Sequence, residues 1–208
     1  MMTHVRTLSI SPRAFRGWAM AGLAGLALAG CVSLAPEAPD SLLRLTPEHV
    51  APAGTTTSGK LTDALVVLDP EADRSLDALR VPVRVDASSL AYLKDAGWVE
   101  KPTRLFRGLL AETIRAENGG MVLEGGDFEV TGKTFVGGRL LEMGYEASTQ
   151  SVVVRFDAVL SHRGGDEIKR KRFEAVIPGV APKAQTVGPA LNRAANDVAG
   201  QVAAWVRD

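Results

Sequence analysis

The sequence predicts an α+β fold in which two amphipathic helices pack on one face of a mainly antiparallel sheet. Apolar and polar residues alternate, as they do in strands, along much of the second half of the chain. Apolar residues recur at helical spacing over 103–117 and 187–206. The resulting order of strands, helix, strands and helix is typical of a sheet that carries its helices on one side. A composition of 46% hydrophobic and 23% charged residues is ordinary for a globular protein.

The first 30 residues predict a signal peptide that is absent from the mature protein. Their only charges are three arginines, and residues 17–29 form an apolar run of small residues, Leu, Trp and Met. A basic start, a short apolar run and small residues before the cleavage point define a secretory signal. The run is also shorter than the roughly 20 apolar residues that a membrane-spanning helix needs.

The end of this segment, Leu28, Ala29 and Gly30 followed by Cys31, resembles the lipobox of bacterial lipoproteins. In that family the cysteine thiol receives a diacylglycerol group, the signal is cut just before it, and the new amine is acylated. Cys31 is the only cysteine of the chain, and several acyl chains suffice for stable anchoring. An ordinary signal peptide with a chance cysteine is the alternative. Val32, where aspartate would favour the inner membrane, favours a periplasm-facing domain anchored in the outer membrane.

Residues 31–60 are predicted to form a flexible acylated tether, and residues 61–208 the α+β domain. The tether contains four prolines and a polar stretch at 54–59, a composition that buries too little apolar surface to offset the entropy of the chain. The short segment 41–45 has the residues to pair as a strand, and the sequence leaves that pairing open.

The first half of the domain predicts short strands and one helix. Residues 64–68 are an apolar run that ends at Asp-Pro, and residues 80–85 alternate valines with polar residues. Pro82 favours an edge strand or a position where its nitrogen faces no partner. Residues 89–93 are the expected hairpin partner of 80–85. The helix over 103–117, which Thr103 is placed to cap, is expected to stop at Asn118-Gly119-Gly120, and 128–131 is a further candidate strand.

The second half predicts three longer strands, over 139–147, 151–161 and 167–177, and a final helix over 187–206. Gly164-Gly165 marks a hairpin turn, and the basic run 169–172 beside it is expected to be a solvated hairpin tip. Asn192 and Asn196 are placed on the outward side of the final helix. The strand residues expected to face the core are Leu141, Met143, Tyr145, Val152, Val154, Phe156, Ala158, Leu160, Phe173, Ala175 and Ile177.

Charge and motif content exclude several classes of function. The 24 basic residues balance the 24 acidic ones, whereas a general nucleic-acid binder needs a basic surplus. One cysteine excludes a disulfide framework and a thiolate metal cluster. His49 lies in the tether and His162 beside a turn, where a rigid, desolvated general base is not expected. We therefore predict a protein that is not an enzyme and that holds no metal and no cofactor besides the lipids on Cys31.

Four segments in order carry a family resemblance: 80–85 (RVPVRV), 90–93 (LAYL), 97–102 (GWVEKP) and the amphipathic stretch 105–114. This order resembles the auxiliary lipoproteins of ABC-type transporters, a family that includes the lipoprotein of the paraquat-inducible Pqi system. The second half fits as well, with the strand that ends near Tyr145, the Phe-Glu-Ala triplet at 173–175 and the final Ala-Trp-Val. The resemblance covers 61–208, with Met143 at a position where phenylalanine is expected.

The resemblance implies a non-catalytic outer-membrane component that docks the periplasmic MCE-domain protein of an ABC transporter for lipids or other hydrophobic molecules. Tyr92 and Trp98 are the candidate contact residues, and the alternative is that both belong to the core. An assembly lipoprotein for secretion or peptidoglycan synthesis is the second functional hypothesis, and an envelope hydrolase the third. Homo-oligomerisation, the substrate and the docking surface stay open.

Overall fold

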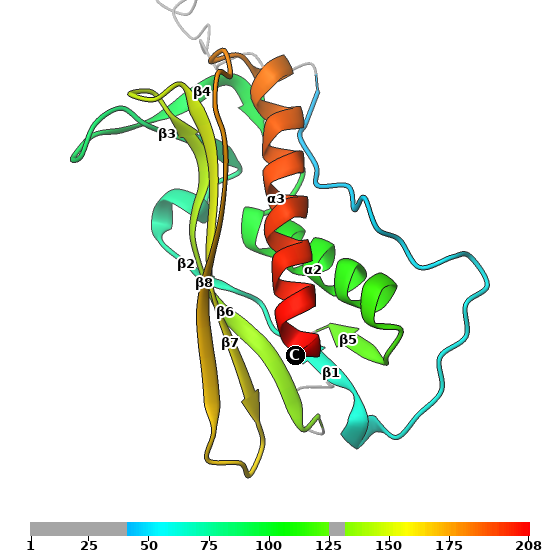
Figure 1. Cartoon of the computed structure of the whole chain (residues 1–208). Helices are drawn as coiled ribbons and strands as arrows, with labels where there is room; N and C mark the ends of the chain where they lie inside the picture. Colours follow the sequence, from blue (N-terminus) through cyan, green and yellow to red (C-terminus); the bar gives the residue numbers. More distant parts are fainter. Residues whose placement is uncertain (1–40, 125–131) are drawn as a thin grey trace, which may run out of the picture. The chain divides into compact units, whose positions relative to one another are not determined.

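The computed structural model describes residues 41–124 and 132–208 and confirms the α+β fold. Over these residues an eight-stranded sheet carries two α-helices, α2 (Pro102–Asn118) and α3 (Ala184–Arg207), on one of its faces (Figure 1). The candidate strand at 128–131 lies outside the described residues. The strands are β1 (Leu65–Val67), β2 (Glu71–Ala72), β3 (Arg80–Arg84), β4 (Leu90–Gly97), β5 (Val122–Glu124), β6 (Thr134–Glu146), β7 (Ser151–His162) and β8 (Ile168–Ile177).

The sheet is mixed rather than purely antiparallel. Both predicted hairpins are confirmed, because β3 pairs with β4 and β7 with β8 in antiparallel register. β6 pairs with β7 in the same way. The shorter strands differ: β1, β2 and the end of β3 run parallel to β6, and β1 also runs parallel to β5. The long β6–β7–β8 meander thus forms the body of the sheet, and short segments from the first half of the chain extend it.

The core face of β6 changes phase at a bulge. Leu140 is opposite Phe156 and Glu142 is opposite Arg155, so Leu141 is the extra residue between them. Leu140 is fully buried and Leu141 only half-buried, so the prediction that Leu141 faces the core is wrong. The other predicted core residues of these strands are buried, apart from Ile177, which is half-buried. The basic run 169–172 is exposed, as expected of a hairpin tip.

Pro82 lies in an interior strand, since β3 is placed between β4 and β6. The register with β4 shifts between Arg80 and Pro82, and the parallel ladder with β6 includes only Val83 and Arg84. The proline nitrogen, which has no hydrogen to donate, therefore stands where the ladders are interrupted. The sequence predicted for Pro82 either an edge strand or a site where its nitrogen faces no partner, and the structure excludes the edge strand.

Both helices begin and end close to the predicted residues. Pro102 occupies the first position of α2, where its missing N–H costs no hydrogen bond. Gly119, at φ +63°, ends the helix in the left-handed conformation, and its N–H donates to the carbonyl of Arg115 at 3.2 Å. The Phe106 ring of α2 contacts the edge of Phe156 with centroids 5.1 Å apart, so aromatic packing joins the helix to the centre of the sheet.

Candidate functional site

Part of the predicted tether packs on the domain, and this part begins at Leu43. We call residues 43–51 the strap. The Leu43 N–H donates to the carbonyl of Gly97 at 2.7 Å, and the Val99 N–H donates to the carbonyl of Leu43 at 2.9 Å. These bonds pair Leu43 with Trp98 as a parallel bridge, which answers the open question about segment 41–45. Leu43 also lies so close to Gly188 of α3 that a Cβ there would meet it at 2.6 Å.

Beyond Leu43 the strap lies on the two helices. Asn196 is 6% exposed, although the sequence placed it on the outward side of α3, and its side-chain N–H group donates to the carbonyl of Thr46 at 3.0 Å. The prediction of a freely flexible 31–60 tether is therefore wrong for the strap. Three side-chain oxygens accept strap N–H groups: Asn192 from Thr46 at 2.7 Å, Asn196 from Glu48 at 2.8 Å and Glu112 from Ala51 at 2.9 Å.

Trp98 is a core residue and not a contact residue. Its side chain is 2% exposed, and its indole Nε1 has no hydrogen-bond partner within the described part of the chain. The backbone N–H donates to the carbonyl of Leu79 at 3.1 Å. Because the ring is buried in the hydrophobic core, a partner cannot reach it, and the core alternative holds for Trp98.

Tyr92 is half-buried on β4, and the Arg80 guanidinium lies over its ring, 4.6 Å from the centroid. Such a cation–π pair at a partly exposed site contributes about 0.5–1 kcal/mol. The ring is thus only partly accessible and already has a cationic neighbour. Tyr92 keeps a surface position, unlike Trp98.

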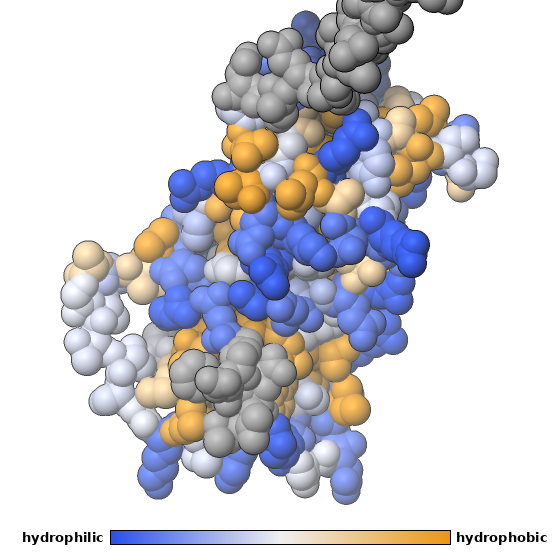
Figure 2. Space-filling view, turned by 180° about the vertical axis from the view of Figure 1, so that it is seen from behind, coloured by the Kyte–Doolittle hydropathy of each residue, from blue (hydrophilic) through white to orange (hydrophobic). Residues whose placement is uncertain are grey.

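Three exposed aliphatic residues lie next to Trp98 along the chain or across the backbone hydrogen bonds around it. Leu42, Leu79 and Val99 are 53%, 50% and 54% exposed, and the backbone bonds from Trp98 and Val99 bring their chain segments together. We call these three residues the Trp98 corner. They follow or precede strands rather than lie within them, so neither the strand nor the helix period could single them out. Figure 2 shows hydrophobic residues gathered toward both ends of the face seen from behind, with a hydrophilic belt between them.

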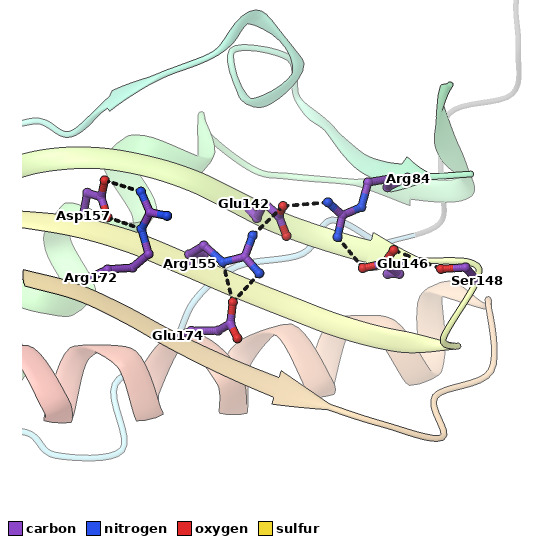
Figure 3. A network of polar contacts seen from close by, with 8 residues as sticks. All are labelled: Arg84, Glu142, Glu146, Ser148, Arg155, Asp157, Arg172 and Glu174. Carbon is purple, nitrogen blue, oxygen red and sulfur yellow. Dashed lines mark hydrogen bonds and ion pairs between the residues drawn. The ribbon is translucent and has the colours of Figure 1, made fainter. Parts of the chain in front are cut away.

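Charged side chains pair across strands on the face of the sheet opposite the helices (Figure 3). Arg84 of β3 donates to Glu142 at 2.9 Å and also to Glu146, both on β6. Arg155 of β7 donates to Glu142 at 2.8 Å and to Glu174 of β8. The hydrogen bond from Arg84 lowers the pKa of Glu146, and the reciprocal contact raises the pKa of Arg84. The charged residues of this outer face therefore neutralise one another in pairs.

The most buried carboxylate of this face is Asp157 on β7. Arg172 donates to it twice, at 2.5 and 2.8 Å, and Arg170 once at 3.2 Å. The hydrogen bonds from Arg172, and next the charges of both arginines, hold the pKa of Asp157 below its usual value. A depressed pKa in the folded state stabilises the fold above the unfolded-state pKa of about 3.9.

We expect Asp157→Asn to lower the free energy of unfolding at pH 7 by about 1.5–3 kcal/mol, the range for hydrogen bonds to charged groups. As the pH falls, the parent protein protonates Asp157 and loses the same contribution, so the difference between the two proteins should shrink below about pH 4. Urea midpoints measured from pH 7 to pH 3 test this. A difference that is constant over this range would show that the carboxylate charge is not what stabilises the site.

The remaining candidate residues are placed as follows. Leu28, Ala29, Gly30 and Cys31 lie outside the described residues, so the lipobox stays a prediction. Both His49 and His162 are exposed. In residues 41–124 and 132–208, no group of three or more histidine, cysteine, aspartate or glutamate side chains is placed to hold a metal ion. No helix of this part is long and apolar enough to cross a membrane.

No family model matches the chain, and a search of the curated proteins also finds no match. Solved structures do share its fold. Protein XCC0632 from Xanthomonas campestris, of the family DUF330, has a TM-score of 0.59 and 17% identity over 82% of this chain and 93% of that protein. A structure described as an uncharacterized protein has a TM-score of 0.55 and 12% identity over 73% and 94% of the two chains. At these identities the likeness shows one thing, that this chain and the DUF330 protein have a similar fold.

Proposed function

We propose that this protein is a non-catalytic, lipid-anchored auxiliary component of an MCE/ABC-type system that moves lipids or other hydrophobic molecules across the envelope. In this role it faces the periplasm from the outer membrane and docks the MCE-domain protein of the transporter. The observation that carries the proposal is the ordered set of family-like segments from 80 to 114, which stands behind a lipobox at Cys31.

The positions of these segments in the fold support the proposal, because together they form one continuous unit. The first two segments are the β3–β4 hairpin, the third contains buried Trp98 and the helix-starting Pro102, and the fourth is the body of α2. Each residue type in the resemblance therefore has a structural task. A contiguous unit of this kind supports a relationship between this chain and the auxiliary lipoproteins more strongly than isolated matching residues would.

The Trp98 corner is the docking surface that we propose within this role. Contiguous exposed apolar patches mark interaction sites, and the corner brings three exposed aliphatic residues together on neighbouring backbone segments. One of its residues, Leu42, is only 11 positions after Cys31 in the sequence. A partner bound there would meet the domain at the same end at which the strap joins the sheet.

A strain that lacks the protein tests both parts of this proposal by complementation. We expect Cys31→Ser to give an uncleaved protein without fatty-acid label that does not restore outer-membrane integrity. We expect Val99→Asp to be labelled and folded but to lose most of its co-purification with the MCE-domain protein of its own operon. Val176→Asp, the same change at an exposed site on β8, is the matched control and should behave like the parent.

Two results would contradict the proposal. Full rescue by the unlipidated Cys31→Ser protein would exclude the anchored role. Parent-like binding by Val99→Asp would exclude the Trp98 corner as the docking surface. Co-purification with a secretion or peptidoglycan enzyme in place of the MCE-domain protein would favour the assembly hypothesis.

A further inference from the structure

A pocket of about 290 Å³ opens on the outer face of the sheet. Its floor is the part of β6 that follows the bulge, together with Val153 of β7. One wall is the short 3-10 helix η2 (Arg74–Leu76), and the other is the end of the β3–β4 hairpin. Because helices cover the opposite face, this pocket belongs to neither the strap nor the Trp98 corner.

The interior of the pocket is apolar, although the sheet face around it is charged. Leu76, Pro82 and Val153 are buried, Leu141 is half-buried, and Leu90 is half-exposed at the mouth. The next outward positions of β7 are Arg155 and Asp157, which belong to the ion pairs described above. The bulge contributes directly, because it gives Leu141 to the pocket in place of the core.

The pocket carries one negative charge that no arginine balances. Asp86, Glu142 and Glu146 are among its lining residues, and Arg84 is the cationic one. Arg84 pairs with both glutamates, and Arg155 also pairs with Glu142, so the remaining charge is that of Asp86. Asp86 has no cationic partner in the described part of the chain; it accepts hydrogen bonds from Ser88 instead, at 2.8 and 3.1 Å. Hydrogen bonds from this turn lower the pKa of Asp86, so it is ionised at neutral pH.

We propose that this pocket binds a small amphiphilic cation, that is, an alkyl or aryl group that carries an ammonium charge. The apolar group would occupy the space between Leu76, Leu141 and Val153, and the ammonium would lie at the mouth beside Asp86. The volume fits, since an apolar protein cavity of about 150 Å³ accommodates a benzene molecule. A pocket that combines apolar walls with one unpaired carboxylate favours a cation over an anion. The inference is independent of the anchor and of the transport role.

The test is a calorimetric titration of the full chain carrying Cys31→Ser with two probes of equal chain length, decyltrimethylammonium and decyl sulfate, both below their micellar concentrations. We expect the cation to bind at least tenfold more tightly than the anion. Leu141→Trp, which fills the pocket, should weaken binding of the cation more than tenfold. Leu61→Trp, at an exposed site that does not line the pocket, should leave the affinity unchanged.

A second variant keeps the test decisive if Leu141→Trp does not fold. Asp86→Asn retains the side-chain oxygen that accepts the turn hydrogen bonds but removes one negative charge at an exposed position. This variant should bind the cation about threefold more weakly. Its affinity ratio between decyltrimethylammonium and decyl sulfate should therefore be smaller than that of the parent. Equal affinity for the two probes, or parent-like affinity in a folded Leu141→Trp protein, would overturn the proposal.

Discussion

Replacing Gly138 by alanine is expected to lower the free energy of unfolding by several kcal/mol. Gly138 lies within β6 at φ +135°, a conformation that side chains rarely allow, and such strain costs about 1–3 kcal/mol. A Cβ at this position would also lie 1.9 Å from the carbonyl oxygen of Asp157 on β7. That neighbour is backbone, so it can move only if the β6–β7 ladder separates. Thermal unfolding followed by circular dichroism measures the effect.

Gly164→Ala is the matched control for this variant. Gly164 also has a positive φ, +77°, but nothing lies within 4 Å of the added Cβ. The control therefore carries backbone strain without the collision, and it should lose only about 1–2 kcal/mol. If both variants melt at the same temperature, the close approach between β6 and β7 does not determine the outcome.

The second large effect is expected for Val154→Asp. Val154 is fully buried, and it stands between Met143 of β6 and Ala175 of β8 on the core face of the central strand. A lone carboxylate there loses its hydration without gaining a partner, which costs several kcal/mol. That is comparable to the whole stability of a domain, about 5–15 kcal/mol. We expect an unfolded or insoluble protein.

Val176→Asp serves as the control again, because it places the same side chain on the exposed face of β8. Surface substitutions of this kind change stability by about 0.5 kcal/mol or less. Urea unfolding of the two variants compares the buried site with the exposed one. Two proteins of equal stability would mean that the assignment of strand faces is wrong.

The sequence was sufficient for the features that depend on neighbours along the chain. The β6–β7–β8 meander follows from regular alternation and a Gly-Gly turn, and the stop of α2 follows from the left-handed preference of Gly119. The apolar stripe of α3 is likewise confirmed, because its residues as far as Val202 recur at helical spacing and are buried. These are the elements in which local pattern and tertiary environment agree.

The features that were missed depend on contacts between distant residues. β1, β2 and β5 contain only two or three residues each, too few to show a period, so their parallel pairing was invisible. The bulge at Leu141 inserts one residue without any glycine or proline to signal it. Asn196 looked like an exposed polar residue because its partner, the carbonyl of Thr46, is 150 positions away.

The candidate site likewise combines a local motif, which the sequence can predict, with features formed by distant residues, which it cannot. The lipobox is a local motif that the sequence alone can state, and it remains a prediction. For Trp98 the contact hypothesis is wrong and the core alternative is right, because burial of this ring depends on residues that are distant in the sequence. The Trp98 corner and the pocket emerge only when strand ends and loops are brought together in three dimensions.

The docking of the strap changes how far the domain can stand from the membrane. In the proposed anchored form, the chain between the anchor and the first docked residue runs from Cys31 to Leu43 rather than to the start of the predicted domain at Leu61. At about 3.3–3.6 Å per residue, the first span reaches at most about 40 Å and the second about 100 Å. The shorter span confines the domain to a volume about 15-fold smaller than the longer span would allow. The local concentration of the domain for any partner at that membrane rises by the same factor. In the proposed anchored form the domain therefore stays within about 40 Å of the membrane, and a partner from the other membrane would have to span the remaining distance.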